Sequence, residues 1–388
     1  MPQLELPPLG LYIHLPWCER KCPYCDFNSH EARQIPERAY IDSLLADLAV
    51  DAHYAQGRTV ATLFIGGGTP SLFSAAGIAQ LMAGIRARIP LAADVEATME
   101  ANPGSAEADK FAGFRAAGIN RLSIGIQSFQ SAQLQALGRV HNSDQAHAAI
   151  AAARAAGFQR LNLDLMHGLP QQDSKLALAD LTTAIGYGIS HLSWYQLTIE
   201  QNTVFYTQPP LLPVEDALAD IQDAGEALLA ATALRQYEVS AWAAPGQQCR
   251  HNLNYWEFGD YLGIGAGAHG KVSFADGRIL RYAKRRQPEA YMAAAPGEKS
   301  VQPQWLQARD LPGEYMLNAL RLNGGFQLTD YTARTGLAAE TLQPALDTLL
   351  GRNLLQQEGA QIRATDLGRR FLDSVIAEFL AWPAQKSY

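Results

Sequence analysis

Three cysteines lie within eight residues near the start of the chain: Cys18, Cys22 and Cys25, in the pattern C-x3-C-x2-C. Thiolates this close in sequence must share one loop, and cysteine thiolates are the usual ligands of iron–sulfur clusters. Three thiolates leave one iron of a four-iron cluster open, as a catalytic metal site keeps a free position. The spacing therefore predicts a 4Fe–4S cluster with one open iron.

Other uses of these cysteines fit the sequence less well. A zinc site would offer four ligands in two paired halves, and the fourth cysteine, Cys249, is more than two hundred residues away. A disulfide framework is typical of short, cysteine-rich secreted chains. A zinc site and a loop without a metal stay as the alternatives.

Composition limits the class of protein. The chain has 388 residues, 48% of them hydrophobic and 18% charged, and a net charge of −7. An acidic balance argues against general nucleic-acid binding, which requires a basic face. No uncharged apolar run is long enough for a transmembrane helix, and the first five residues lack the features of a secretory signal. We expect a cytoplasmic protein.

The first 240 residues alternate between short apolar runs and amphipathic stretches. This alternation predicts βαβ units around a parallel sheet, and so an α/β fold with an open (β/α)6 partial TIM barrel. The expected strands are residues 11–15, 60–65, 95–100, 121–126, 160–166 and 191–199.

Polar or glycine-rich residues follow most of these strands. GGGTPS occupies residues 66–71 after the second strand, Glu100 closes the third, Gln127 follows the fourth, and Asp164 lies in the fifth. In barrels of this kind the functional site gathers at the carboxyl ends of the strands. The sequence therefore predicts one functional mouth.

The alternation fades after residue 240. We expect a partial barrel over residues 1–240, a barrel extension and connector with the motif HNLNYW over residues 241–300, and a small C-terminal domain over residues 301–388. Residues 293–312 have the composition of a connector. The residues that follow predict a winged-helix-like α+β domain, because they contain three helical patterns, a turn-rich stretch at 351–364 and Thr365 as a helix cap. This architecture does not by itself imply DNA binding.

The chain resembles the radical S-adenosylmethionine superfamily. The cysteine triplet is its signature, and Tyr24 is the usual aromatic residue before the last cysteine. The run YIHLPWC at residues 12–18 and the loop at 66–71 resemble the group that contains the oxygen-independent coproporphyrinogen oxidases and the HemW heme chaperones. The resemblance extends over nearly the whole chain, including the C-terminal domain.

This resemblance implies roles for particular residues. The three cysteines would bind the cluster, and the methionyl amine and carboxylate of S-adenosylmethionine would bind the open iron. Glycines would let the backbone approach the cofactor closely, because they have no Cβ. The residues expected around S-adenosylmethionine are Tyr12, Tyr24, Gly67, Gly68, Thr69, Glu100, Gln127, Arg139 and Asp164.

Structural roles for the charged residues stay open. Glu100 could cap a neighbouring helix, Arg139 could belong to a surface ion pair, and Asp164 could be a structural acid at the barrel mouth. By hydrogen-bond type alone, a carboxylate suits ribose hydroxyls and an arginine suits a carboxylate.

Two departures distinguish the chain from the oxidases. They carry a further cysteine two residues after the triplet, where this chain has Phe27, and a longer segment before the cysteines than the 17 residues here. Both departures match the HemW group, as does the motif HNLNYW at residues 251–256. The resemblance thus favours a chaperone over an enzyme.

Heme binding would follow from the HemW resemblance. His251 of the motif is the leading candidate ligand, because imidazole suits iron and Tyr255 and Trp256 could pack against a porphyrin. A hydrogen-bonded histidine beside core aromatics is the alternative. Cys249 could be an alternative ligand, a covalent attachment point or an inert buried thiol. His14 and His269 are further candidates, and a basic run at residues 278–286 could meet propionates or form a solvated edge.

The sequence therefore predicts a cytoplasmic heme chaperone that holds a 4Fe–4S cluster and S-adenosylmethionine, binds heme and passes it to an unidentified acceptor protein. The leading alternative is an oxygen-independent coproporphyrinogen III oxidase, and a radical enzyme that acts on another substrate is a third possibility. Homodimer formation is left open by the sequence.

Overall fold

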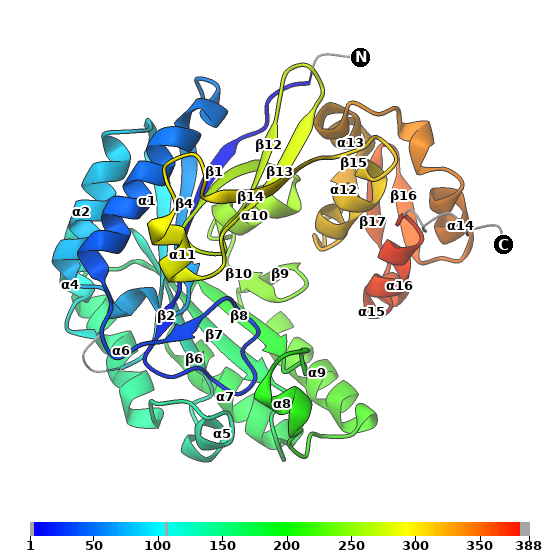
Figure 1. The fold of residues 1–388 in the computed structure, drawn as a ribbon. Coiled ribbons are helices and arrows are strands. Elements are labelled where there is room, and N and C mark those ends of the chain that lie inside the picture. Colours follow the sequence, from blue (N-terminus) through cyan, green and yellow to red (C-terminus); the bar gives the residue numbers. More distant parts are fainter. Residues whose placement is uncertain (1–3, 105–107, 381–388) are drawn as a thin grey trace.

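Two bodies make up the protein, a large α/β body and a smaller C-terminal one that lies beside it (Figure 1). The structure is a computed structural model and describes residues 4–104 and 108–380. The parts of the expected domains at 1–3, 105–107 and 381–388 lie outside the described residues.

A single large sheet dominates the first body. Its parallel strands are β1 (Leu9–Leu15), β4 (Val60–Gly67), β5 (Leu91–Ala101), β6 (Arg121–Gln127), β7 (Arg160–His167), β8 (His191–Gln196) and β11 (Asp260–Ile264). Antiparallel strands at the two edges are β9 (Arg235–Glu238), β10 (Ala241–Ala243), β12 (His269–Ser273), β13 (Ile279–Lys284) and β14 (Ser300–Trp305). The order is β14-β13-β12-β11-β1-β4-β5-β6-β7-β8-β10-β9.

Helices pack around this sheet (Figure 1). They are α1 (Glu37–Asp51), α2 (Ala75–Arg86), α4 (Phe111–Ala117), α5 (Ser131–Ala136), α6 (Ser143–Ala155), α7 (Ser174–Gly186), α8 (Val204–Thr207), α9 (Glu215–Ala230), α10 (Arg250–Trp256) and α11 (Pro288–Ala293). Of these helices, α1, α2, α4, α6 and α7 cover the outer side of the sheet, whereas α10 lies within its curve (Figure 1). Two 3-10 turns, η1 (Ala52–Ala55) and η2 (Pro70–Leu72), and a short strand pair, β2 (Trp17–Cys18) with β3 (His30–Glu31), complete the body.

Parallel strands covered on both faces are expected to be apolar along most of their length. In β1 six of seven residues are buried. The helices add one apolar stripe each, as in α1, where Tyr40, Ile41, Leu44 and Leu48 are fully buried. This packing confirms the predicted α/β fold with a partial barrel, whose expected strands correspond to β1, β4, β5, β6, β7 and β8.

The C-terminal body has its own core. Its elements are α12 (Leu311–Ala319), β15 (Phe326–Gln327), α13 (Leu328–Thr335), η3 (Ala339–Leu342), α14 (Ala345–Gly351), β16 (Leu355–Glu358), β17 (Gln361–Ala364), α15 (Asp366–Arg370) and α16 (Leu372–Ala377). Tyr315, Tyr331 and Leu349 are buried among its apolar side chains. Thr365 caps α15 as predicted, because its side chain accepts a hydrogen bond from the Gly368 amide at 3.0 Å.

The region after residue 240 is more regular than the sequence suggests. Strands β11 to β14 continue the large sheet beyond β1. The connector expected over residues 293–312 contains β14, which pairs with β13 and crosses the boundary expected at residue 300. Among the described residues, no helix has the length and apolar character needed to cross a bilayer.

Candidate cofactor-binding site

A cavity of about 420 Å³ lies inside the partial barrel. We call it the central cavity. It brings together the three cysteines and eight of the nine residues expected around S-adenosylmethionine: Tyr24, Gly67, Gly68, Thr69, Glu100, Gln127, Arg139 and Asp164. The ninth, Tyr12, lines an adjoining cavity that also touches Gly67 and Glu100. The predicted mouth at the strand ends is therefore a real concave surface.

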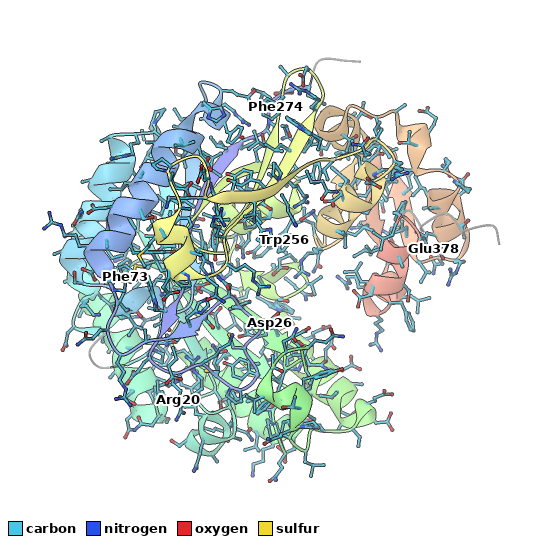
Figure 2. All side chains as sticks on the ribbon, viewed as in Figure 1. Arg20, Asp26, Phe73, Trp256, Phe274 and Glu378 are labelled. Atoms are coloured by element: carbon cyan, nitrogen blue, oxygen red, sulfur yellow. The ribbon has the colours of Figure 1, made fainter. Side chains whose placement is uncertain are left out.

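Cys18 is the last residue of β2, and Cys22 and Cys25 lie on the segment between β2 and β3, which we call the cysteine loop. Figure 2 labels Arg20 and Asp26 of this loop. The Thr69 hydroxyl donates to Cys18 Sγ at 3.4 Å, and Arg139 donates to Cys22 Sγ at 3.6 Å. Cys25 Sγ lies 3.7 Å from the Ser29 hydroxyl. Each sulfur thus has a polar neighbour that can donate to it.

These thiols fit an iron–sulfur cluster better than a single metal ion. All three are half-buried and free of disulfides. Across residues 4–104 and 108–380, no three His, Cys, Asp or Glu side chains converge as a single ion requires. A four-iron cluster presents a separate iron to each thiolate, so its ligands need not converge on one point. The charge of Arg139 beside Cys22 also suits an anionic cluster.

The glycine loop at the end of β4 packs against the strands that lead to the cysteines. The Gly67 amide donates to Glu100 at 3.1 Å, Gly68 donates to the Leu15 carbonyl at 2.8 Å, and Thr69 to the Trp17 carbonyl at 2.7 Å. A Cβ on Gly67 would lie 2.6 Å from the His14 ring, and one on Gly68 would lie 2.5 Å from the Trp17 carbonyl oxygen. Glycine is required at both positions so that the end of β4 can pack closely against β1 and β2.

Two carboxyls face the central cavity. Burial, and then the nearby Asp164, raise the pKa of Glu100 from 4.5 to about 8. Burial also raises the pKa of Asp164, although Ser123 and Asn162 donate to its oxygens at 2.9 and 2.7 Å. Glu100 accepts from the Gly67 amide at a strand end, so it does not cap a helix. Both groups are positioned to accept hydrogen bonds from hydroxyls.

Gln127 and Arg139 are held by neighbours inside the barrel. Gln127 has a φ of 64°, in the left-handed region that non-glycine residues rarely adopt, and its Oε1 accepts from the Tyr195 hydroxyl at 2.8 Å. Arg139 donates to Asn102 Oδ1 at 2.7 Å and to the Gly125 carbonyl at 3.0 Å. Arg139 is therefore held inside the barrel by neutral oxygen acceptors and does not form the surface ion pair considered as its structural role.

The structure does not place His251 as a heme ligand. The ring is 1% exposed, with Nδ1 hydrogen-bonded to the Thr62 hydroxyl at 2.9 Å and Nε2 to the Tyr255 hydroxyl at 3.0 Å. Burial lowers its pKa to about 3. Binding of heme iron by His251 would require one of these hydrogen bonds to break, so the hydrogen bonds fit the structural alternative and the role of His251 as a heme ligand stays a prediction. Cys249, at 1% exposure, is likewise a buried thiol.

Two other basic candidates, His14 and Lys284, are buried and bonded to neighbouring residues. His14 is buried, with its ring nitrogens bonded to the Tyr12 hydroxyl and the Asn28 carbonyl at 2.9 and 2.8 Å. Lys284 is 1% exposed and pairs with Asp47 and Asp51, both at 2.7 Å. It belongs to the core and not to a solvated edge.

Several cavity residues were missed by the sequence analysis. Asn162 donates to Ser123 at 2.7 Å, and its Oδ1 contacts the His191 ring at 2.6 Å. These side chains alternate along β6, β7 and β8, so period-two spacing of polar residues within apolar strands was the available signal. The missed cavity residues include Asn102, Ser123, Asn162, His191 and Ser193.

Comparison with known proteins agrees with this geometry. Residues 12–181 match the radical SAM superfamily model, and residues 306–371 match the HemN C-terminal domain model. The chain is 51% identical to the heme chaperone HemW of Escherichia coli K12, over 97% of this chain and 100% of that protein. It is 46% identical to the heme chaperone HemW of Haemophilus influenzae, over 97% and 99%.

A solved structure shows the same fold. The coproporphyrinogen III oxidase HemN of Escherichia coli superposes with a TM-score of 0.83 over 97% of this chain and 91% of that one, at 24% identity. At this identity the likeness concerns the fold alone. The full-length similarity to proteins named HemW carries the assignment further, and the chain belongs to the HemW family of the radical SAM superfamily.

Proposed function

We propose that the protein is a heme chaperone, which binds heme together with a 4Fe–4S cluster and S-adenosylmethionine and transfers the heme to an acceptor protein. The observation that carries this proposal is the 51% identity, over 97% of the chain, to a protein named heme chaperone HemW. We also infer a cytoplasmic location, where thiolates and cluster would be protected by reducing conditions.

The central cavity supports the cofactor part of this proposal. Cys18, Cys22 and Cys25 would hold the cluster, which supplies an open iron and an electron when bound. Glu100 and Asp164 would accept hydrogen bonds from the ribose hydroxyls of S-adenosylmethionine, since carboxyl oxygens are acceptors for hydroxyl donors. Arg139, fixed by Asn102 and Gly125, would place positive charge beside the cluster.

The remaining expected residues would shape this pocket. Tyr24 contacts Phe205 with ring centroids 6.3 Å apart, which fixes an aromatic wall beside the last cysteine. Gln127 is oriented by Tyr195. Gly67, Gly68 and Thr69 would set the distance between the cysteine loop and the strand ends, because their amides are bonded to Glu100, Leu15 and Trp17.

The test is an anaerobic titration of the reconstituted protein with hemin, followed by absorption spectra and by transfer to candidate apo-hemoproteins. We expect a Soret change at stoichiometric hemin and, when an acceptor is added, replacement of that band by the Soret band of the acceptor. Absence of any Soret change in the cluster-loaded protein would refute the proposal. A parallel assay with coproporphyrinogen III and a reductant would detect an oxidase by formation of protoporphyrinogen.

A further inference from the structure

A second cavity, of about 640 Å³, opens beside the central cavity. We call it the side cavity. Its walls come from β1, β11, β12, β13, β14, α10 and the cysteine loop, and it shares Phe27, Gly67 and Glu100 with the central cavity. A volume of this size is in the range of pockets that bind cofactors.

One histidine at this cavity has a free ring. His269, the first residue of β12, is exposed, and no hydrogen bond to its ring exists among the described residues. His14 and His251 differ in that both of their ring nitrogens are bonded. Partial burial, and then the charges of Arg281 and Arg286, lower the pKa of His269. A neutral imidazole is the form that binds iron.

The side cavity also has aromatic walls. Tyr255 and Tyr261 meet edge to face with ring centroids 4.5 Å apart, and both line it. Phe27 is 61% exposed at its rim, although large aromatic side chains are usually buried. Tyr255 and Trp256 line different cavities, so only Tyr255 of that pair faces this one. Such walls suit a large, flat and mostly apolar ligand.

Positive charge is available at the rim. Arg281 pairs with Glu314, and Lys284 pairs with Asp47 and Asp51. Arg286 also lines the side cavity, is exposed, and makes no ion pair in the part of the chain that the structure describes. Its backbone is fixed, because Asn28 donates to its carbonyl at 2.9 Å. An exposed guanidinium on a fixed backbone suits a ligand carboxylate.

From these four features we infer that the side cavity is the heme site, with His269 as an axial ligand of the iron and Arg286 bound to a propionate. This inference rests on the proposed function and adds where the heme binds and which residue binds its iron. It also puts the porphyrin next to the central cavity, since Phe27, Gly67 and Glu100 border both.

The test compares anaerobic hemin titrations of the full-length protein and four variants: His269→Ala, His251→Ala, His53→Ala and Arg286→Gln. His53 is the matched control, because it is exposed and lines neither cavity. Absorption and electron paramagnetic resonance spectra report nitrogen ligation, and circular dichroism reports folding. We expect His269→Ala alone to lose the nitrogen-ligated spectrum and to bind hemin about tenfold more weakly, with added imidazole restoring the spectrum.

Hemin dimethyl ester tests the carboxylate contact, because it lacks free propionates. The wild type should prefer hemin to the ester by several-fold, and Arg286→Gln should lose this preference. A wild-type spectrum in His269→Ala, or loss of nitrogen ligation in His251→Ala instead, would overturn the inference while leaving the proposed function in place. No hemin binding by the wild type would overturn both.

Discussion

Replacing Glu100 with glutamine tests whether ionisation of this buried carboxyl destabilises the folded protein. The two side chains have the same shape, and a glutamine oxygen can still accept the Gly67 amide that lies 3.1 Å from Glu100 Oε2. The substitution therefore removes the ionisable proton and leaves the packing in place. Its effect on stability should depend on pH, because burial and Asp164 raise the pKa of Glu100 to about 8.

The sign follows from proton linkage. A carboxyl whose pKa is higher in the folded state binds its proton more tightly there, so folding is favoured at low pH and loses stability as pH rises. One pKa unit corresponds to about 1.4 kcal/mol, so a rise from 4.5 to about 8 corresponds to at most about 5 kcal/mol. Because the carboxyl faces a cavity that water can enter, we expect about 2 kcal/mol.

Urea unfolding of the cluster-free protein measures this difference. Near pH 5 the wild type and Glu100→Gln should have similar free energies of unfolding, and above about pH 8 the variant should be about 2 kcal/mol more stable. Glu289→Gln is the control, because Glu289 is exposed on α11. An equal difference between wild type and Glu100→Gln at both pH values would refute the reasoning.

Three further substitutions test separate parts of the structure. Cys22→Ala should prevent cluster assembly, measured as iron and sulfide content after reconstitution, whereas Cys249→Ala should retain it, because Cys249 is buried outside the central cavity; cluster assembly in Cys22→Ala would contradict the ligand assignment. Gly68→Ala should destabilise the fold by about 1–3 kcal/mol and reduce cluster content, because its Cβ would lie 2.5 Å from the Trp17 oxygen; unchanged unfolding and iron content would contradict this account. Lys284→Met should cost about 3–5 kcal/mol in urea unfolding, because it leaves Asp47 and Asp51 buried without their cation; an equal loss in the exposed control Lys175→Met would argue against the ion-pair explanation.

The central strands were predictable because they are covered on both faces. Such strands appear in sequence as continuous apolar runs, and β6 begins at the expected residue, Arg121. The strand β14 could not be recognised in the same way. Its sequence is SVQPQW, its side chains are mostly exposed, and it contains Pro303. A polar edge strand with a proline has the same local composition as a connector.

The sequence was sufficient to predict which residues surround the central cavity, but not which hydrogen bonds each side chain makes. The cysteine spacing and the polar strand ends place the right residues around one cavity. The environment of His251 could not be read locally, because its Nδ1 partner, Thr62, is 189 residues away in sequence. The same applies to His269, whose free ring is evident only when its neighbours in β11, β13 and the cysteine loop are known.

The cysteine loop physically connects the two cavities. Trp17, which precedes Cys18, is buried against Tyr40 with ring centroids 4.6 Å apart, and this contact fixes one end of the loop. At the other end Asn28 donates to the Ala266 and Arg286 carbonyls, both at 2.9 Å. Only Asp26 separates Cys25 from Phe27, which borders both cavities. A cluster held by Cys25 would therefore restrict Phe27, and a ligand that displaced Phe27 would strain the cysteine loop.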